Sequence, residues 1–255
     1  MRAPDELRAL VEGAISEVVL SSDLGALEQP MRYALEGGKR VRGTICLATA
    51  EAAGCPPSAA LPAAAALECL HAFSLVHDDL PALDNDDERR GRPSTHVAFG
   101  EGVALLAGDA LLAEALRQAL AYDDPEIARE LCGATLGMIG GQHLDITNAT
   151  VELGELHRLK TGRLFSASVG LGVRVAGLTE AEQAPWRSFA EELGLLFQVV
   201  DDMLDGDGYA ERLGQDAART LAGEAADRAR ARLQEIEADT ATLAAIVDEL
   251  EVRTA

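Results

Sequence analysis

The chain has 255 residues, of which 48% are hydrophobic and only 4% are aromatic. A chain of this length can bury a sizeable core, and this composition makes that core aliphatic. The net charge of −21 argues against a nucleic-acid partner and against attachment to anionic lipid through a basic patch.

Alanine and leucine dominate the sequence, whereas the valine, isoleucine and aromatic runs of a sheet protein are scarce. We therefore predict one all-α domain covering residues 1–255. The four cysteines show no C-x-x-C spacing, which indicates free, mostly buried thiols in a reducing cytoplasm. We find no signal peptide and no uncharged run that approaches the ~18 apolar residues of a membrane helix, so we expect a cytoplasmic protein without an integral membrane segment.

The first helices are expected over residues 5–20 and 28–53, and a glycine pair at residues 37–38 interrupts the second. Glycine costs roughly 1 kcal/mol relative to alanine inside a helix, so the pair requires a reason. Lys39 and Arg42 follow it and share a helical face, as residues three apart do. This pattern favours a phosphate site, although a plain helix break with a solvated basic tip would give the same sequence.

Residues 78–90 hold six carboxylates and end in two adjacent arginines, Arg89 and Arg90. Carboxylates this dense repel one another unless cations lie among them. Hard ions such as Mg²⁺ bind through one or two carboxylates together with waters and phosphates, and arginines grip phosphate bidentately. Taken alone, the segment fits a metal and phosphate site and a solvated acidic loop equally well.

The helix before this segment is expected over residues 59–80, with His71 and Asp78 on one stripe. Pro81 should end it, because proline cannot continue a helix. Asp78 and Asp84 are six residues apart and would lie on nearly opposite sides of an unbroken helix. The break at Pro81 therefore lets both carboxylates face one ion.

Further helical patterns follow the acidic segment in close succession. One of them contains the sequence Lys160-Thr161-Gly162, and Lys160 and Lys39 are the only lysines of the chain. Arginine supplies every other long cationic side chain, so both lysines are candidates for function. The expected ranges are 99–121, 124–147, 151–175, 179–205 and the outer helices within 209–252.

A second acidic motif closes the helix expected over residues 179–205. Its polar side chains lie within about 100° of one another on the helix, and the residues beside them are apolar. An exposed acidic stripe fits this apolar setting poorly, and the like charges need a cation. The motif consists of Gln198, Asp201, Asp202 and Asp205.

Two aspartate-rich helix ends, each accompanied by basic groups, predict a diphosphate held between them by Mg²⁺ in an aliphatic cavity. The expected reaction is ionisation of a carbon–oxygen bond to diphosphate. We find no hydrolase triad, Walker loop or dinucleotide fingerprint that would compete with this interpretation.

In this order the motifs resemble those of the trans-isoprenyl diphosphate synthases, also called polyprenyl synthetases, and particularly the bacterial farnesyl and geranylgeranyl diphosphate synthases. The resemblance runs from about residue 30 to residue 205. The matching segments are Gly37–Arg42, His71, His77–Asp87, Arg89–Gly91, Gly108–Leu112, Gly140–Gln142, Lys160–Gly162 and Phe197–Asp205.

The resemblance implies an isoprenoid-synthase helical bundle around a central cavity, usually a homodimer. It implies condensation of isopentenyl diphosphate with an allylic diphosphate, with about three Mg²⁺ ions per active site once substrate is bound. The implied metal ligands are Asp78, Asp84, Asp201 and Asp205. The implied catalytic residues are Asp78, Asp84, Asp201 and Lys160. The allylic diphosphate would be held by Arg89, Lys160, Thr161 and Gln198, and isopentenyl diphosphate by Lys39, Arg42, His71 and Arg90.

In such enzymes product length depends on residues just before the first aspartate motif. Phe73, five residues before Asp78, resembles the aromatic floor of a farnesyl-producing enzyme, so a C15 product is favoured over C20. The chain departs from the family after Asp205, where the segment is short and contains no lysine. The alternatives are a class I terpene cyclase of the same fold, a non-catalytic partner subunit of a prenyl synthase and an acidic helical scaffold.

Overall fold

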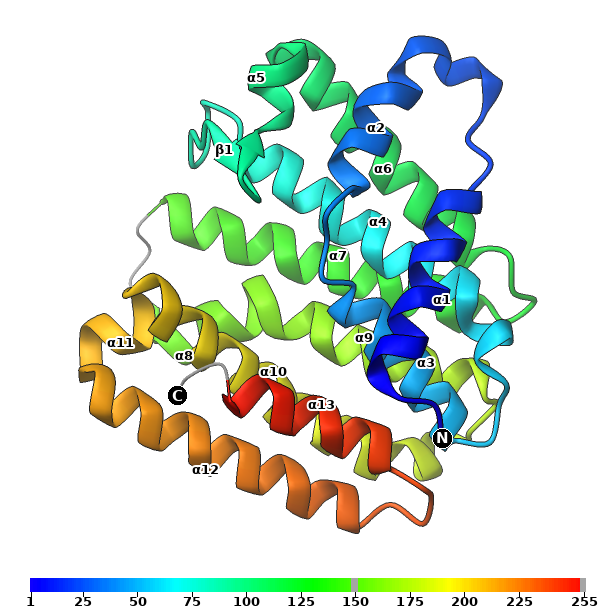
Figure 1. Ribbon diagram of the computed structural model, residues 1–255, viewed down its shortest axis with the longest axis vertical. Helices are drawn as coiled ribbons and strands as arrows, with labels where there is room; N and C mark the ends of the chain where they lie inside the picture. The colour runs from blue at the N-terminus through cyan, green and yellow to red at the C-terminus, as the bar shows by residue number, and fades with distance from the viewer. Residues whose placement is uncertain (148–150, 253–255) are drawn as a thin grey trace.

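Helices build almost all of the part of the chain that the structure describes, residues 1–147 and 151–252 of this computed structural model (Figure 1). The prediction of an all-α fold is confirmed, and the helix breaks at residues 36–40 and after Asp78 lie where the sequence indicated them. The helical elements are α1 Pro4–Glu17, η1 Ser22–Leu27, α2 Glu28–Leu35, α3 Val41–Ala52, η2 Pro57–Ala60, α4 Leu61–Asp78, α5 Thr95–Phe99, α6 Glu101–Ala119, α7 Pro125–Ile146, α8 Leu153–His157, η3 Arg158–Gly162, α9 Arg163–Val175, α10 Glu180–Asp205, α11 Gly208–Leu213, α12 Gln215–Gln234 and α13 Ala241–Val252.

A two-stranded hairpin follows the acidic loop. Strand β1, Glu88–Arg89, pairs antiparallel with β2, Arg92–Pro93, so that Arg89 lies opposite Arg92. The two residues between the strands, Arg90 and Gly91, have φ angles of 59° and 74°. Positive φ at both central residues is the backbone of a tight hairpin turn, and it is uncommon for a residue with a side chain.

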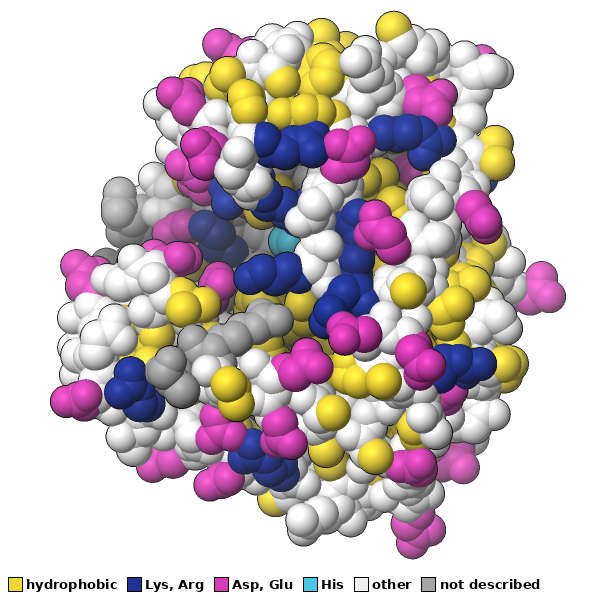
Figure 2. Space-filling model, viewed as in Figure 1, with side chains coloured by type: hydrophobic (Ala, Val, Ile, Leu, Met, Phe, Trp, Pro, Cys, Tyr) yellow, Lys and Arg dark blue, Asp and Glu magenta, His cyan; other side chains and the backbone are white. Residues whose placement is uncertain are grey.

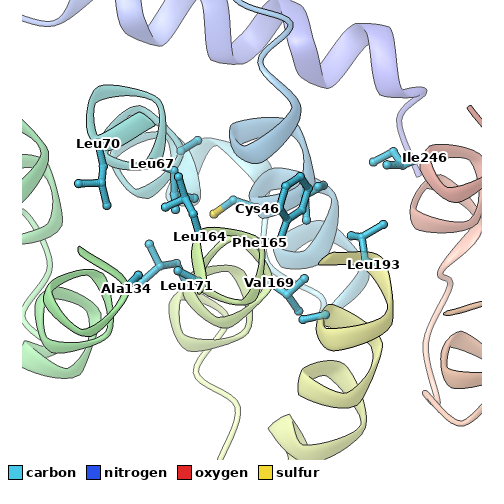
Figure 3. Packing of buried hydrophobic residues seen from close by; sticks show 14 of the residues in the cluster. Cys46, Leu67, Leu70, Ala134, Leu164, Phe165, Val169, Leu171, Leu193 and Ile246 are labelled. Carbon is cyan, nitrogen blue, oxygen red and sulfur yellow. The ribbon is translucent and has the colours of Figure 1, made fainter. Parts of the chain in front are cut away.

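The core is aliphatic and lies between helices α3, α4, α9 and α10. Figure 3 shows Leu67 of α4 and Cys46 of α3 directed toward Leu164 and Phe165 of α9. Helices α3 and α9 approach closely because Gly172 has no side chain; a Cβ there would lie 2.7 Å from the carbonyl oxygen of Cys46. This packing fixes α3 and α9 relative to one another. Arg42 lies in the first turn of α3, and Lys160 lies on η3 directly before α9.

The segment Pro57–Asp78, which includes α4, is long and apolar enough to cross a membrane, with a mean hydropathy of 1.6. The segment contains Glu68 and Asp78, so it is not an uncharged run and does not contradict the expectation from the sequence. Within the fold, 67% of the apolar window is buried, which is what a central core helix requires. Helix α4 packs most extensively against α6, above it in Figure 1.

The four cysteines are free thiols, but only two of them are buried. Cys46 and Cys69 lie in the core, where burial raises the pKa of both thiols. Cys55 is half-buried and Cys132 is exposed on α7. The expectation of mostly buried thiols therefore holds for the core pair alone.

The C-terminal helices form the outer layer that the sequence predicted, at the bottom of Figure 1. Helix α12 packs along α10, and α13 packs on α12. The face of α12 toward α10 is lined by alanines, including Ala222, Ala225 and Ala229, which let the helix axes approach closely. This layer supports α10, which carries the second aspartate motif at its C-terminal end.

Candidate active site

The first aspartate motif is shaped by the end of α4. The helix stops at Asp78, three residues before Pro81, and the chain folds back so that the N–H of Asp84 donates to the carbonyl oxygen of Asp78 at 2.8 Å. Burial raises the pKa of the Asp78 carboxyl to about 6; Asp84 and Asp79 add to the rise, while Lys160 and Arg89 oppose it. A half-buried carboxylate with a second one beside it is a favourable place for a cation.

Asp79 turns away from this pair and holds an arginine. Its side chain is 2% exposed and accepts hydrogen bonds from Arg89, one of them from Nε at 3.0 Å. The same guanidinium donates to Asp86 at 2.8 Å. Two of the acidic residues of the loop therefore orient Arg89, and Asp78 and Asp84 are the pair that lies beside the cavity residues Lys160 and Gln142.

The second aspartate motif divides in a similar way. Burial and the neighbouring Asp205 raise the pKa of Asp201, and Arg42 and Lys39 oppose this rise. Asp202 is 3% exposed and is used within the fold. It accepts hydrogen bonds from the side chain of Gln198 and, at 2.7 Å, from the backbone N–H of Tyr209 at the start of α11.

Asp202 therefore anchors the short segment after α10, and Asp201 and Asp205 are left on the side toward Lys39 and Arg42. The predicted stripe of three aspartates does not act as one face. Gln198 keeps its side-chain oxygen buried without a hydrogen-bond partner among the described residues. That oxygen is an acceptor available to a ligand or to water.

A set of cationic groups surrounds His71 on α4. Burial holds the pKa of His71 well below its usual value, and Arg42, Arg90, Arg89 and Arg40 lower it further. The imidazole is therefore neutral near pH 7. Figure 2 shows lysine and arginine side chains lining a central hollow with a histidine at its base, on a molecule whose other surface in this view is studded with carboxylates.

Arg42, in the first turn of α3, is held by aromatic rings. Its Cζ lies 4.8 Å from the ring centroid of Phe165 and 5.6 Å from that of Phe197. Burial lowers its pKa to about 10, so it stays charged at neutral pH. Its Nε is buried without a hydrogen-bond partner among the described residues, which leaves a directed donor for an anion. Lys39 is exposed near Asp201.

Lys160 and Thr161 lie on η3, a single turn of π-helix between α8 and α9. Turns of π-helix are rare in proteins, and those that occur are often found at functional sites. The Nζ of Lys160 donates to Asp145 on α7 at 2.6 Å. Gly141 makes this approach possible, since a Cβ there would lie 2.6 Å from the backbone nitrogen of Lys160. One residue further on, Gln142 donates to Asp84 at 3.3 Å, which ties α7 to the acidic loop.

A cavity of about 280 Å³ begins at Asp78 and Lys160 and continues between α4 and α7. Phe73 lines it with its ring edge-on to His77 at a centroid distance of 4.9 Å. Phe73 and Asp78 are five residues apart on α4, and both face this cavity. The remaining wall is mainly apolar and includes Leu83, Met138, Ile139 and Ile146.

Comparison with known sequences decides the family. The family described as polyprenyl synthetase matches residues 25–224, a span that contains both aspartate motifs, His71 and Lys160. The chain belongs to the polyprenyl synthetase family.

Three relatives illustrate the similarity. A heterodimeric geranylgeranyl pyrophosphate synthase large subunit of Arabidopsis thaliana is 42% identical over 232 residues, which are 83% of this chain but 62% of that protein. A farnesyl diphosphate synthase of Geobacillus stearothermophilus is 39% identical over 228 residues, covering 83% of this chain and 77% of the relative. The apo crystal structure of an FPP/GFPP synthase from Zymomonas mobilis superposes with a TM-score of 0.86 at 32% identity, covering 97% of each chain.

The donor set of the candidate site fits magnesium that is shared with a phosphate-bearing ligand. Within residues 1–147 and 151–252, no group of three or more histidine, cysteine or carboxylate side chains is close enough to hold an ion alone. Mg²⁺ takes one or two carboxylates and completes its shell with water and phosphate oxygens. Asp78 with Asp84, and Asp201 with Asp205, each offer such a pair, and burial raises the pKa of Asp78 and of Asp201.

Gln142 and Asp145 were missed as candidate site residues. The sequence showed that they share a face of α7 behind a glycine pair, and that signal could have found them. The structure places Gln142 against Asp84 and Asp145 against Lys160, so this face of α7 joins two predicted parts of the site.

Proposed function

We propose that this polyprenyl synthetase is a chain-elongating prenyltransferase that condenses isopentenyl diphosphate with dimethylallyl or geranyl diphosphate, with farnesyl diphosphate as the main product. The observation that carries the proposal is the presence of two separate cationic sets beside two aspartate pairs. Lys160 and Arg89 act on Asp78, whereas Arg42 and Lys39 act on Asp201. Two cationic sets suit two diphosphates.

Each part of the site has a role in this reaction. Bound Mg²⁺ would neutralise the diphosphate that leaves the allylic substrate. Lys160, Arg89, Thr161 and Gln198 would hold that diphosphate, so that positive charge is in place where negative charge develops. The apolar cavity beyond Asp78 would receive the isoprenoid tail and exclude water from the electron-poor carbon.

The second diphosphate would be held by Lys39, Arg42, Arg90 and the neutral His71. Fixing it beside the allylic carbon makes the attack of the double bond effectively intramolecular. One carbon–carbon bond then forms, and the proton lost from the adjacent carbon passes to the released diphosphate. A class I terpene cyclase has no need for this second set, which is why we place cyclisation second.

The test is an assay of purified protein with isopentenyl diphosphate and a C5, C10 or C15 primer, with and without Mg²⁺. We expect linear C15 diphosphate as the main product and no product after chelation. Cyclic hydrocarbons formed from the C15 primer alone would indicate a cyclase. A folded protein that binds neither substrate would contradict the proposal, and one that is active only with a second subunit would make it a partner subunit.

Phe73→Ala should shift the main product from C15 toward C20. Phe73 is 7% exposed and lines the cavity five residues before Asp78, so removing its ring extends the space for the tail. Chromatography of the products reads the result directly. Phe99→Ala is the control, because the Phe99 ring packs on Tyr33 at 5.1 Å and does not line this cavity. An unchanged product length in Phe73→Ala would contradict the assignment of the floor.

We further propose a homodimer formed through α6 and α7. Leu106 on α6 and Leu136 on α7 are 55% and 71% exposed, and Ile139, a cavity residue, is 49% exposed. A second copy would cover these side chains and close the wall of the cavity. Light scattering should give twice the 26.8 kDa chain mass for wild type and for the control Val19→Asp, and a monomer for Leu136→Asp. A monomeric wild type would contradict the proposal.

The cytoplasmic location expected from the cysteines stays a prediction.

A further inference from the structure

Glu68 is a buried carboxylate on α4 that no part of the proposed reaction uses. Its side chain is 3% exposed and lies ten residues before Asp78. One oxygen, Oε1, accepts the backbone N–H of Gly43 at 2.9 Å, and the other lies 3.8 Å from Nη1 of Arg40. Burying a carboxylate costs folding free energy unless hydrogen bonds and ion pairs offset it. The retention of Glu68 at this position therefore requires a reason.

The backbone next to Glu68 is held in an uncommon conformation. Arg40, between Lys39 and the first turn of α3, has a φ of 53°, in the left-handed region. Its guanidinium is 3% exposed and donates to Glu12 and to the carbonyl oxygen of Leu35. Surrounding contacts must maintain such a conformation. It directs Arg40 inward and leaves Lys39 at the surface, toward the second aspartate motif.

Gly43 brings the first turn of α3 against Glu68. A Cβ at this position would lie 2.8 Å from Cγ1 of Val11 and 3.3 Å from Cγ of Glu68. The absence of a side chain therefore permits the hydrogen bond from the Gly43 N–H. Because Arg42 precedes Gly43 in the chain, this bond also fixes where the Arg42 side chain begins.

Glu68 is also the carboxylate that three arginines of this region share: Arg40 is buried, Arg42 is half-buried and Arg90 is exposed. It forms an ion pair with Arg40, and it opposes the lowering of the pKa of Arg42 and of Arg90 by burial. Glu12 contacts Arg40 and Asp201 acts on Arg42, whereas Glu68 acts on all three arginines. Like charges gathered in a half-buried site need such a counter-charge.

We propose that Glu68 is a positioning residue for the isopentenyl diphosphate site: it holds Arg40, fixes the first turn of α3 and thereby places Arg42. This inference rests on the proposed function. It predicts that loss of the Glu68 charge weakens the second diphosphate site selectively. The allylic site depends on Lys160, Thr161 and Gln198, which lie on η3 and α10 and do not contact Glu68.

The test is Glu68→Gln, which keeps the shape and an acceptor for Gly43 but turns an amide toward Arg40. We expect the KM for isopentenyl diphosphate to rise about 10-fold, while kcat and the KM for the allylic primer stay within about 2-fold. Glu130→Gln is the matched control, since Glu130 bridges Arg174 and Arg187 between α7, α9 and α10. It removes an equally well paired carboxylate and should change neither KM.

Glu68→Asp provides a second reading that does not depend on whether Glu68→Gln folds. The shorter side chain keeps the charge, so a smaller rise in the same KM is expected; no rise in either variant would overturn the inference. Equal rises in both KM values would show a merely structural role and overturn it too.

Calorimetric titration with isopentenyl diphosphate alone separates the role of Glu68 from the proposed function. Wild type that binds it but forms no product refutes the proposed function, and weaker binding to Glu68→Gln then still supports the role of Glu68.

Discussion

Replacing Asp78 by asparagine should lower kcat by about 100- to 1,000-fold and leave the fold intact. The amide has nearly the same shape but carries no charge, so it cannot contribute to holding a cation beside Asp84. Burial raises the pKa of Asp78 to about 6, so the carboxyl is mostly ionised at pH 7. Because the raised pKa means that folding disfavours the ionised form, this charge destabilises the metal-free protein at pH 7. The variant should melt at the same temperature as wild type or slightly higher. Steady-state kinetics at saturating Mg²⁺ and calorimetric melting measure the two effects.

The control for this prediction lies in the same loop. The side chain of Asp87 is 86% exposed, and its Oδ1 lies 3.9 Å from Nε2 of His96. Asp87→Asn should keep kcat within about 2-fold of wild type, because a solvated charge at the surface contributes little. If Asp78→Asn retained more than about a tenth of the wild-type kcat, Asp78 would have to be removed from the proposed machinery.

Lys160→Gln should lower kcat/KM for the allylic diphosphate by about 100-fold, with little change in the KM for isopentenyl diphosphate. The positive charge of Lys160 opposes the raised pKa of Asp78 more strongly than that of Arg89 does. Glutamine keeps a hydrogen-bond donor for Asp145 but removes the charge that would stabilise the leaving diphosphate. Varying one substrate at a time separates the two KM values.

Arg158→Gln is the matched control, because Arg158 lies on the same π-turn and pairs with Glu155 at 2.7 Å. Its side chain is 51% exposed and does not line the cavity at Asp78. This variant should behave as wild type. A parallel rise of both KM values in Lys160→Gln would mean that the substitution disturbs the site as a whole, and the assignment to the allylic side would then fail.

Local chemistry made part of the site predictable from the sequence. Pro81 predicts a helix end, and the spacing of Asp78 and Asp84 then requires the fold-back that the backbone hydrogen bond between them shows. The capping box of Thr179 and Glu182 likewise marks the start of α10. Each of these features depends on residues within a few positions of one another.

The rest depends on contacts that sequence spacing does not encode. Asp145 and Lys160 are 15 residues apart, and Gln142 and Asp84 are 58 apart. Periodicity shows which residues share a helical face but not which of them pack against other elements. Asp202 was therefore grouped with Asp201 and Asp205 although it is buried. The π-turn and the short hairpin were missed because neither has a periodic pattern.

The left-handed turn at Arg90 has a geometric consequence. Arg89 contacts Asp79 at the end of α4, whereas Arg90 donates to the carbonyl oxygen of Glu36 beyond α2. The two adjacent arginines therefore contact the ends of two different helices. Consecutive Cα atoms are about 3.8 Å apart whatever the helices around them do. If each arginine serves one diphosphate, the spacing of the two substrates is set by covalent bonds. Small movements of the surrounding helices would then leave the distance between the reacting carbons of the two substrates unchanged.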